Sequence, residues 1–223
     1  MAFANGVVKV LATGVLALLT LGFGIVPLAS AADPVESLEV VATTKPVISG
    51  TVEINHTLKT KAPEYNVWDV STDYQWYATY PGTSYRNKIP DATGKTYKVS
   101  KSWAGYRISV TAFGSRAGYT PGEAKSASTK SVPYLAVTGK TPTIWGTFKV
   151  GKAIKAGAGS WKPGGMQFHY VWRINGAGYA ETEKPSFTIP KAAKGKRITV
   201  TVTGVKIGYK LVSKTSKSSS KVK

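Results

Sequence analysis

The chain contains no cysteine, and it has only two histidines and 11 acidic residues against 30 lysines and arginines. Without cysteine, disulfides, thiolate metal sites and cysteine nucleophiles are excluded. The sequence also lacks the H-E-x-x-H, EF-hand, P-loop and G-x-S-x-G patterns that accompany metal and nucleophile chemistry. We therefore predict a protein that is not an enzyme and that uses no cofactor and no metal.

Long apolar runs are also missing, except for one near the N-terminus. It extends from Val10 to Val26 and is followed by the small-residue site Ala29-Ser30-Ala31. This order is typical of a secretory signal peptide, so we predict a signal peptide at residues 1–31 and a secreted, extracellular mature protein. Because the run is nearly as long as the roughly 20 residues of a spanning helix, an uncleaved membrane anchor is the alternative, and a membrane contact is expected only in that case.

The remaining chain contains an internal repeat, at an offset of 96 residues early in each half and of 90 later. The matching segments are 45–51 with 141–147, 74–76 with 170–172, 97–99 with 187–189, and 107–111 with 197–201. The first copy therefore has six extra residues between Trp76 and Tyr97. Such a match indicates a duplication. It predicts two domains, copy 1 at residues 38–133 and copy 2 at residues 134–223.

Both copies have the pattern of β-strands. Ile198, Val200 and Val202 alternate with polar residues, and copy 1 repeats the pattern with polar residues at Ser109 and Thr111. We expect one buried and one solvent-exposed face in each sheet, as antiparallel sheets allow. Glycine and proline recur about every ten residues, which is the spacing of a sandwich. The predicted fold class is all-β, with two tandem immunoglobulin-like β-sandwiches after the signal peptide.

Trp76 and Trp172 lie at equivalent positions in the middle of predicted strands. We interpret each as the central core residue of its sandwich. Burial of one indole is worth roughly 4–6 kcal/mol, which matches the roughly 2–5 kcal/mol usually lost with a native disulfide. A sandwich without cysteine is therefore energetically reasonable.

The last ten residues, 214–223, have the composition of a disordered lysine and serine tail. However, the offset of 90 aligns residues 215–222 with residues 125–132, which lie directly before copy 2. We therefore predict a final edge strand with a frayed end, and a loose tail is the alternative.

The repeat also carries a recognisable set of residues, most complete in copy 2. They are Ile144, Gly146, Val150-Gly151-Lys152, Trp161, Tyr170, Trp172, Gly195, Val200, Gly204 and Gly208-Tyr209. The set resembles the tandem immunoglobulin-like repeats of exported actinobacterial (Gram-positive) proteins, over residues 40–223. Copy 1 departs from it at Tyr65, where the tryptophan is expected, and at Asn55-His56, where Gly-Lys is expected. The resemblance implies an envelope or extracellular setting and brings no catalytic residues.

Few side chains suggest chemistry. His56 is at a predicted turn and His169 is on a predicted strand, and we interpret both as surface residues. Copy 2 has only Glu181 and Glu183 as carboxylates, on neighbouring strand or turn positions. A glycosidase needs two carboxylates that flank the sugar bond, but neighbouring charges of this kind are normally solvated. An enzyme is therefore the least supported hypothesis.

Charge is unevenly divided between the copies. Residues 39–133 carry a net charge of +5 and residues 134–223 carry +15. Such a domain attracts anionic polymers over about one Debye length, about 8 Å at physiological salt. The predicted partner is an anionic cell-wall polymer or polysaccharide. Anionic phospholipid headgroups are the other near candidate, and both come ahead of nucleic acid. The candidate contacts are Lys191, Lys194, Lys196, Arg197, Lys206 and Lys210. The alternative is that lysine only keeps the protein soluble and protects sheet edges.

Several aromatic residues have no aromatic counterpart in the other copy. With a neighbouring arginine, they form a second set of candidate ligand-binding residues: Trp68, Tyr80, Tyr85, Arg86, Trp103 and Trp145. Tyr80 and Tyr85 fall in the six-residue expansion, and the segment from Tyr80 to Arg86 is predicted to be a projecting loop, where binding residues concentrate. An ordinary longer hairpin is the alternative.

The leading hypothesis is thus a secreted, non-enzymatic binding module that is cell-envelope associated or extracellular and contacts wall polymers through basic copy 2. A carbohydrate-binding or protein-partner-binding module that uses the aromatic loop of copy 1 is the second.

Overall fold

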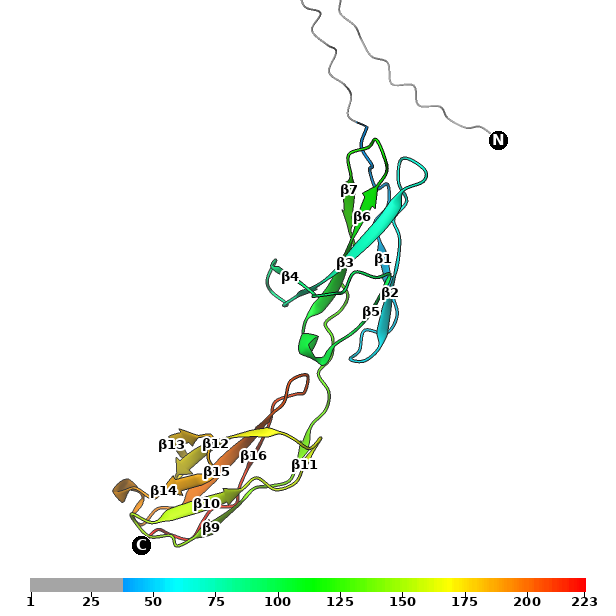
Figure 1. Cartoon of the computed structure of the whole chain (residues 1–223). Helices are drawn as coiled ribbons and strands as arrows, with labels where there is room; N and C mark the ends of the chain where they lie inside the picture. The colour runs from blue at the N-terminus through cyan, green and yellow to red at the C-terminus, as the bar shows by residue number, and fades with distance from the viewer. Residues whose placement is uncertain (1–37) are drawn as a thin grey trace, which may run out of the picture. The chain divides into compact units, whose positions relative to one another are not determined.

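The computed structural model describes residues 38–223, and the predicted signal peptide lies outside them. This part of the chain consists mainly of β-strands and connecting loops, with two three-residue 3-10 helices, η1 (Lys101–Trp103) and η2 (Lys191–Ala193) (Figure 1). Over residues 38–223, no helix is both long and apolar enough to span a bilayer.

Copy 1 folds into two antiparallel sheets that enclose one hydrophobic cluster. Its strands are β1 (Val47–Ser49), β2 (Thr57–Lys61), β3 (Ser71–Thr79), β4 (Arg86–Lys88), β5 (Thr96–Lys98), β6 (Arg107–Ser115) and β7 (Gly122–Lys125). One sheet has the order β1-β2-β5 and the other has the order β4-β3-β6-β7.

Copy 2 repeats this arrangement around a cluster of its own. Its strands are β8 (Thr138–Gly139), β9 (Thr143–Gly146), β10 (Ala153–Gly157), β11 (Trp161–Lys162), β12 (Gln167–Ile174), β13 (Ala177–Thr182), β14 (Ser186–Thr188), β15 (Ile198–Val205) and β16 (Val212–Thr215). The sheets have the orders β9-β10-β14 and β13-β12-β15-β16, and β8 pairs with β11. The predicted all-β class with two immunoglobulin-like sandwiches is confirmed.

The two tryptophans predicted to centre the cores are fully buried, with no exposed surface. The Trp76 ring packs 5.7 Å from the ring of Tyr97, and the Trp172 ring stacks 5.1 Å from the ring of Phe187. Tyr97 and Phe187 are themselves equivalent by the sequence repeat. Each core is therefore organised by the same aromatic pair.

The structure also confirms that Tyr65 in copy 1 takes the place of Trp161 in copy 2. Both rings lie over a glycine of the facing strand. A Cβ atom at Gly114 would be 2.5 Å from the Tyr65 ring, and one at Gly204 would be 2.9 Å from the Trp161 ring. These glycines are needed because no side chain fits beneath the rings.

The prediction that the polar face of copy 1 is exposed to solvent is wrong at two positions. Ser109 is only 3% exposed and Thr111 only 1%. Arg86 covers them, because its Nη2 donates to the hydroxyls of Ser109 at 3.2 Å and Thr111 at 3.1 Å. Its guanidinium also lies 4.0 Å above the ring of Tyr77. A long side chain from the edge strand thus covers polar groups that the alternation pattern assigns to solvent.

The C-terminal segment is neither a loose tail nor a strand throughout. After β16, residues 216–223 belong to no strand apart from an isolated bridge at Val222, and every third residue, Ser216, Ser219 and Val222, is buried. A period of three is that of a polyproline II conformation and differs from the period of two in a strand. The lysines between these positions are all exposed.

Hydroxyl groups attach this segment to the sheet. The Oγ atoms of Ser216 and Ser219 accept hydrogen bonds from the backbone N–H groups of Val200 at 3.0 Å and Ile198 at 2.8 Å. Copy 1 makes the same two bonds at positions 90 residues earlier, with Ser126 and Thr129 as acceptors. The predicted alignment of the two C-terminal segments is therefore confirmed in structure.

Candidate ligand-binding surfaces

The loop of copy 1 from Tyr80 to Tyr85 joins β3 to β4 and projects from the sandwich (Figure 1). Tyr80 is 53% exposed and Tyr85 is 73% exposed. The Tyr80 ring packs edge-on at 5.4 Å from the ring of Tyr106, whereas Tyr85 has no such contact among the described aromatic pairs. Arg86 lies on β4 and is committed to the sheet face, so the loop presents two tyrosines without the predicted arginine.

Trp103 has mainly a structural position. It is half-buried on η1, packs against the copy 1 core and lies edge-on at 5.3 Å from the ring of Tyr106. Burial raises the pKa of the Tyr97 hydroxyl, while hydrogen bonds from the Ser100 amide and the Trp103 side chain lower it. Trp103 therefore supports the core and the tyrosine under the loop, with little surface left for a ligand.

Trp68 lies at the opposite end of β3 from the loop. The two ends of this nine-residue strand are about 26 Å apart at 3.3 Å per residue. Trp68 is 75% exposed, and its ring lies 4.3 Å from the guanidinium carbon of Arg116. The same carbon lies 4.8 Å from the ring of Tyr119. Arg116 was not among the candidate residues predicted from the sequence, although it lies two residues before Gly118-Tyr119, which the repeat matches with Gly208-Tyr209.

Trp145 lies on β9 and is 50% exposed. Its ring lies against Gly157 of β10, where a Cβ atom would be 2.8 Å away, and its register partner on β10 is Lys155. The ring is therefore a flat aromatic surface next to a lysine. The aromatic candidates thus occupy separate surfaces.

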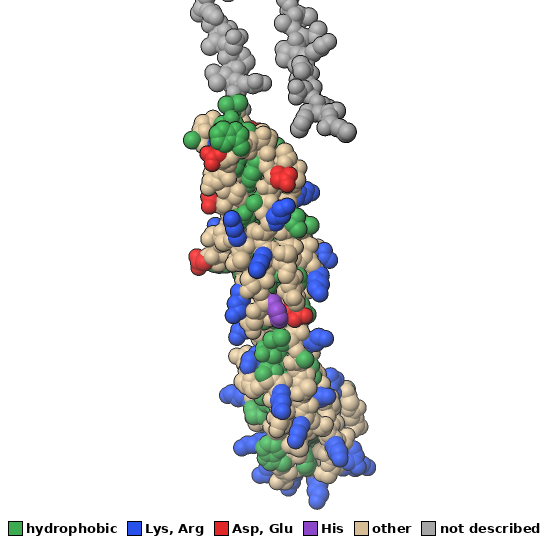
Figure 2. Space-filling view, turned by 90° about the vertical axis from the view of Figure 1, so that its right-hand side faces the viewer, with side chains coloured by type: hydrophobic (Ala, Val, Ile, Leu, Met, Phe, Trp, Pro, Cys, Tyr) green, Lys and Arg blue, Asp and Glu red, His purple; other side chains and the backbone are tan. Residues whose placement is uncertain are grey.

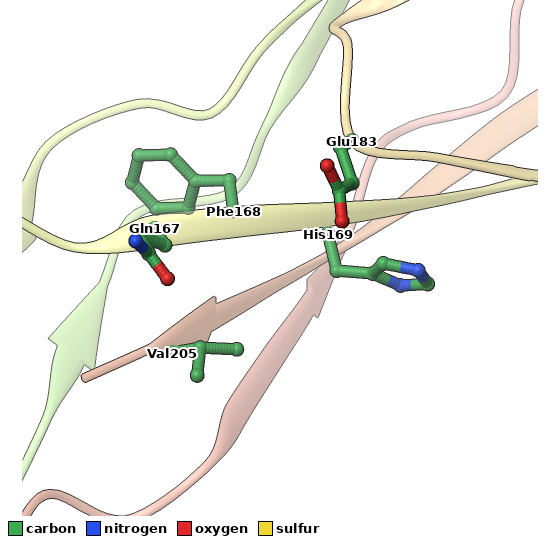
Figure 3. A pocket seen from close by; sticks show the side chains of 5 residues that line it. All are labelled: Gln167, Phe168, His169, Glu183 and Val205. Carbon is green, nitrogen blue, oxygen red and sulfur yellow. The ribbon is translucent and has the colours of Figure 1, made fainter. Parts of the chain in front are cut away.

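One hollow of copy 2 contains its histidine and one of its two glutamates. It is lined by Gln167, Phe168, His169, Glu183 and Val205. Figure 3 shows these five side chains, with Glu183 and His169 to the right of Gln167 and Phe168 and with Val205 below them. Within residues 38–223, no group of three histidine, aspartate or glutamate residues is arranged to hold a metal ion. The hollow can donate and accept hydrogen bonds, but it offers no nucleophile of the kinds named above.

The strongest concentration of charge is at one end of copy 2, which we call the basic pole. Three chain segments form it: the β9–β10 connection at residues 147–152, the η2 segment at residues 190–197, and the C-terminus at residues 221–223. The cations of the basic pole are Lys149, Lys152, Lys191, Lys194, Lys196, Arg197, Lys221 and Lys223, and all are exposed. Figure 2 shows many Lys and Arg side chains and no acidic one on the visible face of copy 2.

Backbone hydrogen bonds hold the three segments of the basic pole together. Val150 N–H donates to the Lys223 carbonyl at 3.0 Å, and Lys223 N–H donates to the Phe148 carbonyl at 2.9 Å. Gly195 N–H donates to the Val222 carbonyl at 2.9 Å. Cations far apart in sequence are thus fixed side by side by backbone pairing.

Within residues 38–223, no carboxylate side chain forms an ion pair with these cations. The ion pairs within residues 38–223 are His56 with Glu53 and Lys125 with Glu123, both in copy 1. Glu181 and Glu183 lie on and next to β13 and form no ion pair with a described cation. Arg197 Nη1 donates to the Ser219 carbonyl at 2.7 Å, but no described carboxylate side chain compensates its charge or that of the seven exposed lysines.

Two of the six predicted polymer contacts lie elsewhere. Lys206 and Lys210 flank the turn between β15 and β16, about 23 Å from the start of β15 at 3.3 Å per residue. Lys206 is also occupied, because its Nζ donates to the carbonyl of Gly164 and lies 5.7 Å from the ring centre of Tyr209. The basic pole therefore contains only the other four predicted contacts, together with four lysines that the prediction omitted.

No protein-family model matches the chain, and no curated protein matches its sequence. Among solved structures, the chain is similar to murine CEACAM1b, with 12% identity and a TM-score of 0.33 over 78% of this chain and 97% of that one. It is also similar to the FN1–FN3 domains of chicken CNTN1, with 10% identity and a TM-score of 0.24 over 81% of this chain and 66% of that one. The immunoglobulin-like fold stated above rests on the strand order, and the resemblance to actinobacterial repeats stays a prediction.

Proposed function

We propose that the protein is an exported, non-enzymatic binding module that attaches to anionic cell-wall polymers through copy 2. The observation that carries this proposal is the basic pole, where eight exposed cations from three segments meet with no carboxylate ion pair. A solvent-exposed ion pair contributes only about 0.2–1 kcal/mol. Binding therefore needs many contacts at once, which a polymer with repeated negative charge supplies.

Location supports the same proposal. The predicted signal peptide places the mature chain outside the cytoplasm, where the abundant polyanions are wall polymers. A polymer contact of this kind is electrostatic and weakens as salt shortens the Debye length from about 8 Å at physiological ionic strength to about 3 Å at 1 M.

The experiment is a pull-down of the mature protein on purified cell walls, with a charge-matched pair of variants. In the pole variant Lys149, Lys191, Lys194 and Lys221 become glutamine, and in the control variant Lys140, Lys162, Lys184 and Lys210 become glutamine. All eight lysines are exposed and each variant loses four charges. We expect the pole variant to lose most wall binding and the control variant to keep most of it, and we expect salt to elute the wild type.

The second candidate function uses the loop from Tyr80 to Tyr85. Its support is the exposure of two tyrosines that are amphipathic and common at protein interfaces. The same pull-down separates the two functions. Equal binding by both charge variants, with release by a soluble glycan or by excess protein but not by salt, would reject the basic pole and favour the loop.

A further inference from the structure

Copy 1 has an arginine that contacts two aromatic rings at the end of the sandwich where β6 turns into β7. The guanidinium carbon of Arg116 is 4.3 Å from the Trp68 ring and 4.8 Å from the Tyr119 ring. Contacts with two rings restrict the guanidinium and orient it, as cation–π contacts do. No described residue accepts a hydrogen bond from Arg116 or pairs with its charge. Its planar fork of N–H donors is therefore ordered but unused.

Copy 2 shows what this position looks like when the cation is used internally. Lys206 replaces Arg116 by the offset of 90, and Gly164 replaces Trp68 by the offset of 96. There the amine donates to the carbonyl of Gly164, and no tryptophan surface is present. The exposed tryptophan and the unused arginine are thus found together in copy 1 alone.

The stack borders a shallow hollow that adds polar groups. Asp69, Ser71, Ser115 and Arg116 line the hollow together with two apolar residues. Asp69 has a left-handed backbone, with φ of 56°. The hollow thus offers a carboxylate and hydroxyls as hydrogen-bond acceptors beside a guanidinium donor.

These groups match the chemistry of one ligand class. A guanidinium fork binds a carboxylate through two parallel hydrogen bonds, and the exposed indole of Trp68 offers an apolar face to the C–H face of a sugar ring. The Asp69 carboxylate accepts hydrogen bonds from sugar hydroxyls, which a uronic acid has beside its own carboxylate and a phosphate chain lacks. We propose that Trp68, Arg116 and Tyr119 form a binding subsite for a uronic acid residue of a polysaccharide.

The subsite differs from the basic pole in what it recognises. The basic pole responds to charge density, whereas the subsite requires a carboxylate and a sugar ring in one ligand. A short acidic sugar therefore tests it separately. The probe is trigalacturonate, compared with the uncharged galactose trimer and with inorganic tripolyphosphate, and binding to the full mature chain is followed by the NMR shift of the Trp68 indole N–H and by titration calorimetry.

We expect trigalacturonate to shift the Trp68 signal and the other two probes not to. Arg116→Lys keeps the charge but loses the planar fork of donors. We therefore expect affinity for trigalacturonate to fall about tenfold, which is about 1.4 kcal/mol of binding free energy, with no loss of thermal stability. Trp68→Ala removes a side chain that is mostly exposed and should weaken binding at least as much. Arg107→Lys on the far end of β6 is the matched control and should bind like the wild type.

The subsite is rejected if tripolyphosphate binds as well as trigalacturonate, if Arg107→Lys weakens binding as much as Arg116→Lys, or if the Trp68 signal does not move. The pole variant described above should bind trigalacturonate like the wild type. If that variant still binds walls but Arg116→Lys loses trigalacturonate, the proposed function of the basic pole fails while the subsite stands. If instead the pole variant loses wall binding while Arg116→Lys binds trigalacturonate like the wild type, only the subsite is rejected.

Discussion

The connection after the central tryptophan strand differs between the copies. In copy 2, β12 turns into β13 through Asn175-Gly176, which both have positive φ, at 49° and 84°. This is the chemistry of a two-residue hairpin turn. In copy 1 a six-residue loop from Tyr80 to Tyr85 separates β3 from β4. The tight turn leaves a six-residue edge strand, whereas the loop leaves only three paired residues, and it frees Arg86 to cover the neighbouring sheet face.

The comparison shows that a duplicated frame keeps its core and varies at its edges and ends. Copy 1 carries the tyrosine loop and the Trp68–Arg116–Tyr119 stack, and copy 2 carries the basic pole. Even inside the cores one polar contact differs. Trp76 Nε1 donates to the Gly94 carbonyl at 2.9 Å, whereas Trp172 Nε1 is buried without a hydrogen-bond partner among residues 38–223.

The largest expected effect comes from replacing each tryptophan with phenylalanine. Trp76→Phe removes the part-buried hydrogen bond to the Gly94 carbonyl and reduces the volume of a fully buried ring, so we expect copy 1 to lose about 2–3 kcal/mol of unfolding free energy. Trp172→Phe removes a hydrogen-bond donor that had no partner, so we expect copy 2 to lose only about 1 kcal/mol of unfolding free energy. Hydrogen exchange of the slowest amides on β6 and β15 reports the two copies separately. Equal losses would show that the indole hydrogen bond does not distinguish the cores.

An intermediate effect is expected where the C-terminal segments attach. Ser219→Ala leaves the buried N–H of Ile198 without an acceptor, so we expect a loss of about 1–2 kcal/mol in copy 2. Thr129→Ala removes the same bond to Ile108 in copy 1, where the hydroxyl is less buried, and should cost about 1 kcal/mol. Faster exchange of the two isoleucine amides is the measurement. Ser218→Ala, at an exposed position, is the control, and a cost equal to that of Ser219→Ala would contradict the period of three.

The smallest effect concerns the arginines on the outer faces. Arg86→Met loses two hydrogen bonds to the buried hydroxyls of Ser109 and Thr111, so we expect copy 1 to lose about 1 kcal/mol of unfolding free energy. Arg173→Met loses one bond of 3.4 Å to Thr201, on a more exposed face, and should cost about 0.3 kcal/mol. Denaturant unfolding that resolves both copies measures the difference. A larger loss of unfolding free energy with Arg173→Met than with Arg86→Met would contradict the conclusion that an arginine covers the outer sheet face mainly in copy 1.

Much of the fold could be predicted because the two copies report on each other. The equivalence of Tyr65 with Trp161, and of Ser126 with Ser216, followed from register alone and is confirmed by packing and hydrogen bonds. Alternation of polar and apolar residues could not reveal the covering of Ser109 and Thr111, because Arg86 reaches them from another strand. The candidate binding surfaces were harder to predict from the sequence, because contacts such as that of Arg116 with Trp68 join segments that are far apart along the chain.

The sequence by itself determined the strand-rich duplication, the tryptophan at each core and the excess of positive charge in copy 2, because these depend on local alternation, repetition and composition. Only the tertiary structure decided where that charge is concentrated. Backbone pairing among residues 147–152, 190–197 and 221–223 gathers eight cations at one end, while the length of β15 keeps Lys206 and Lys210 at the other. Position of this kind depends on long-range hydrogen bonds, and a linear pattern does not encode them.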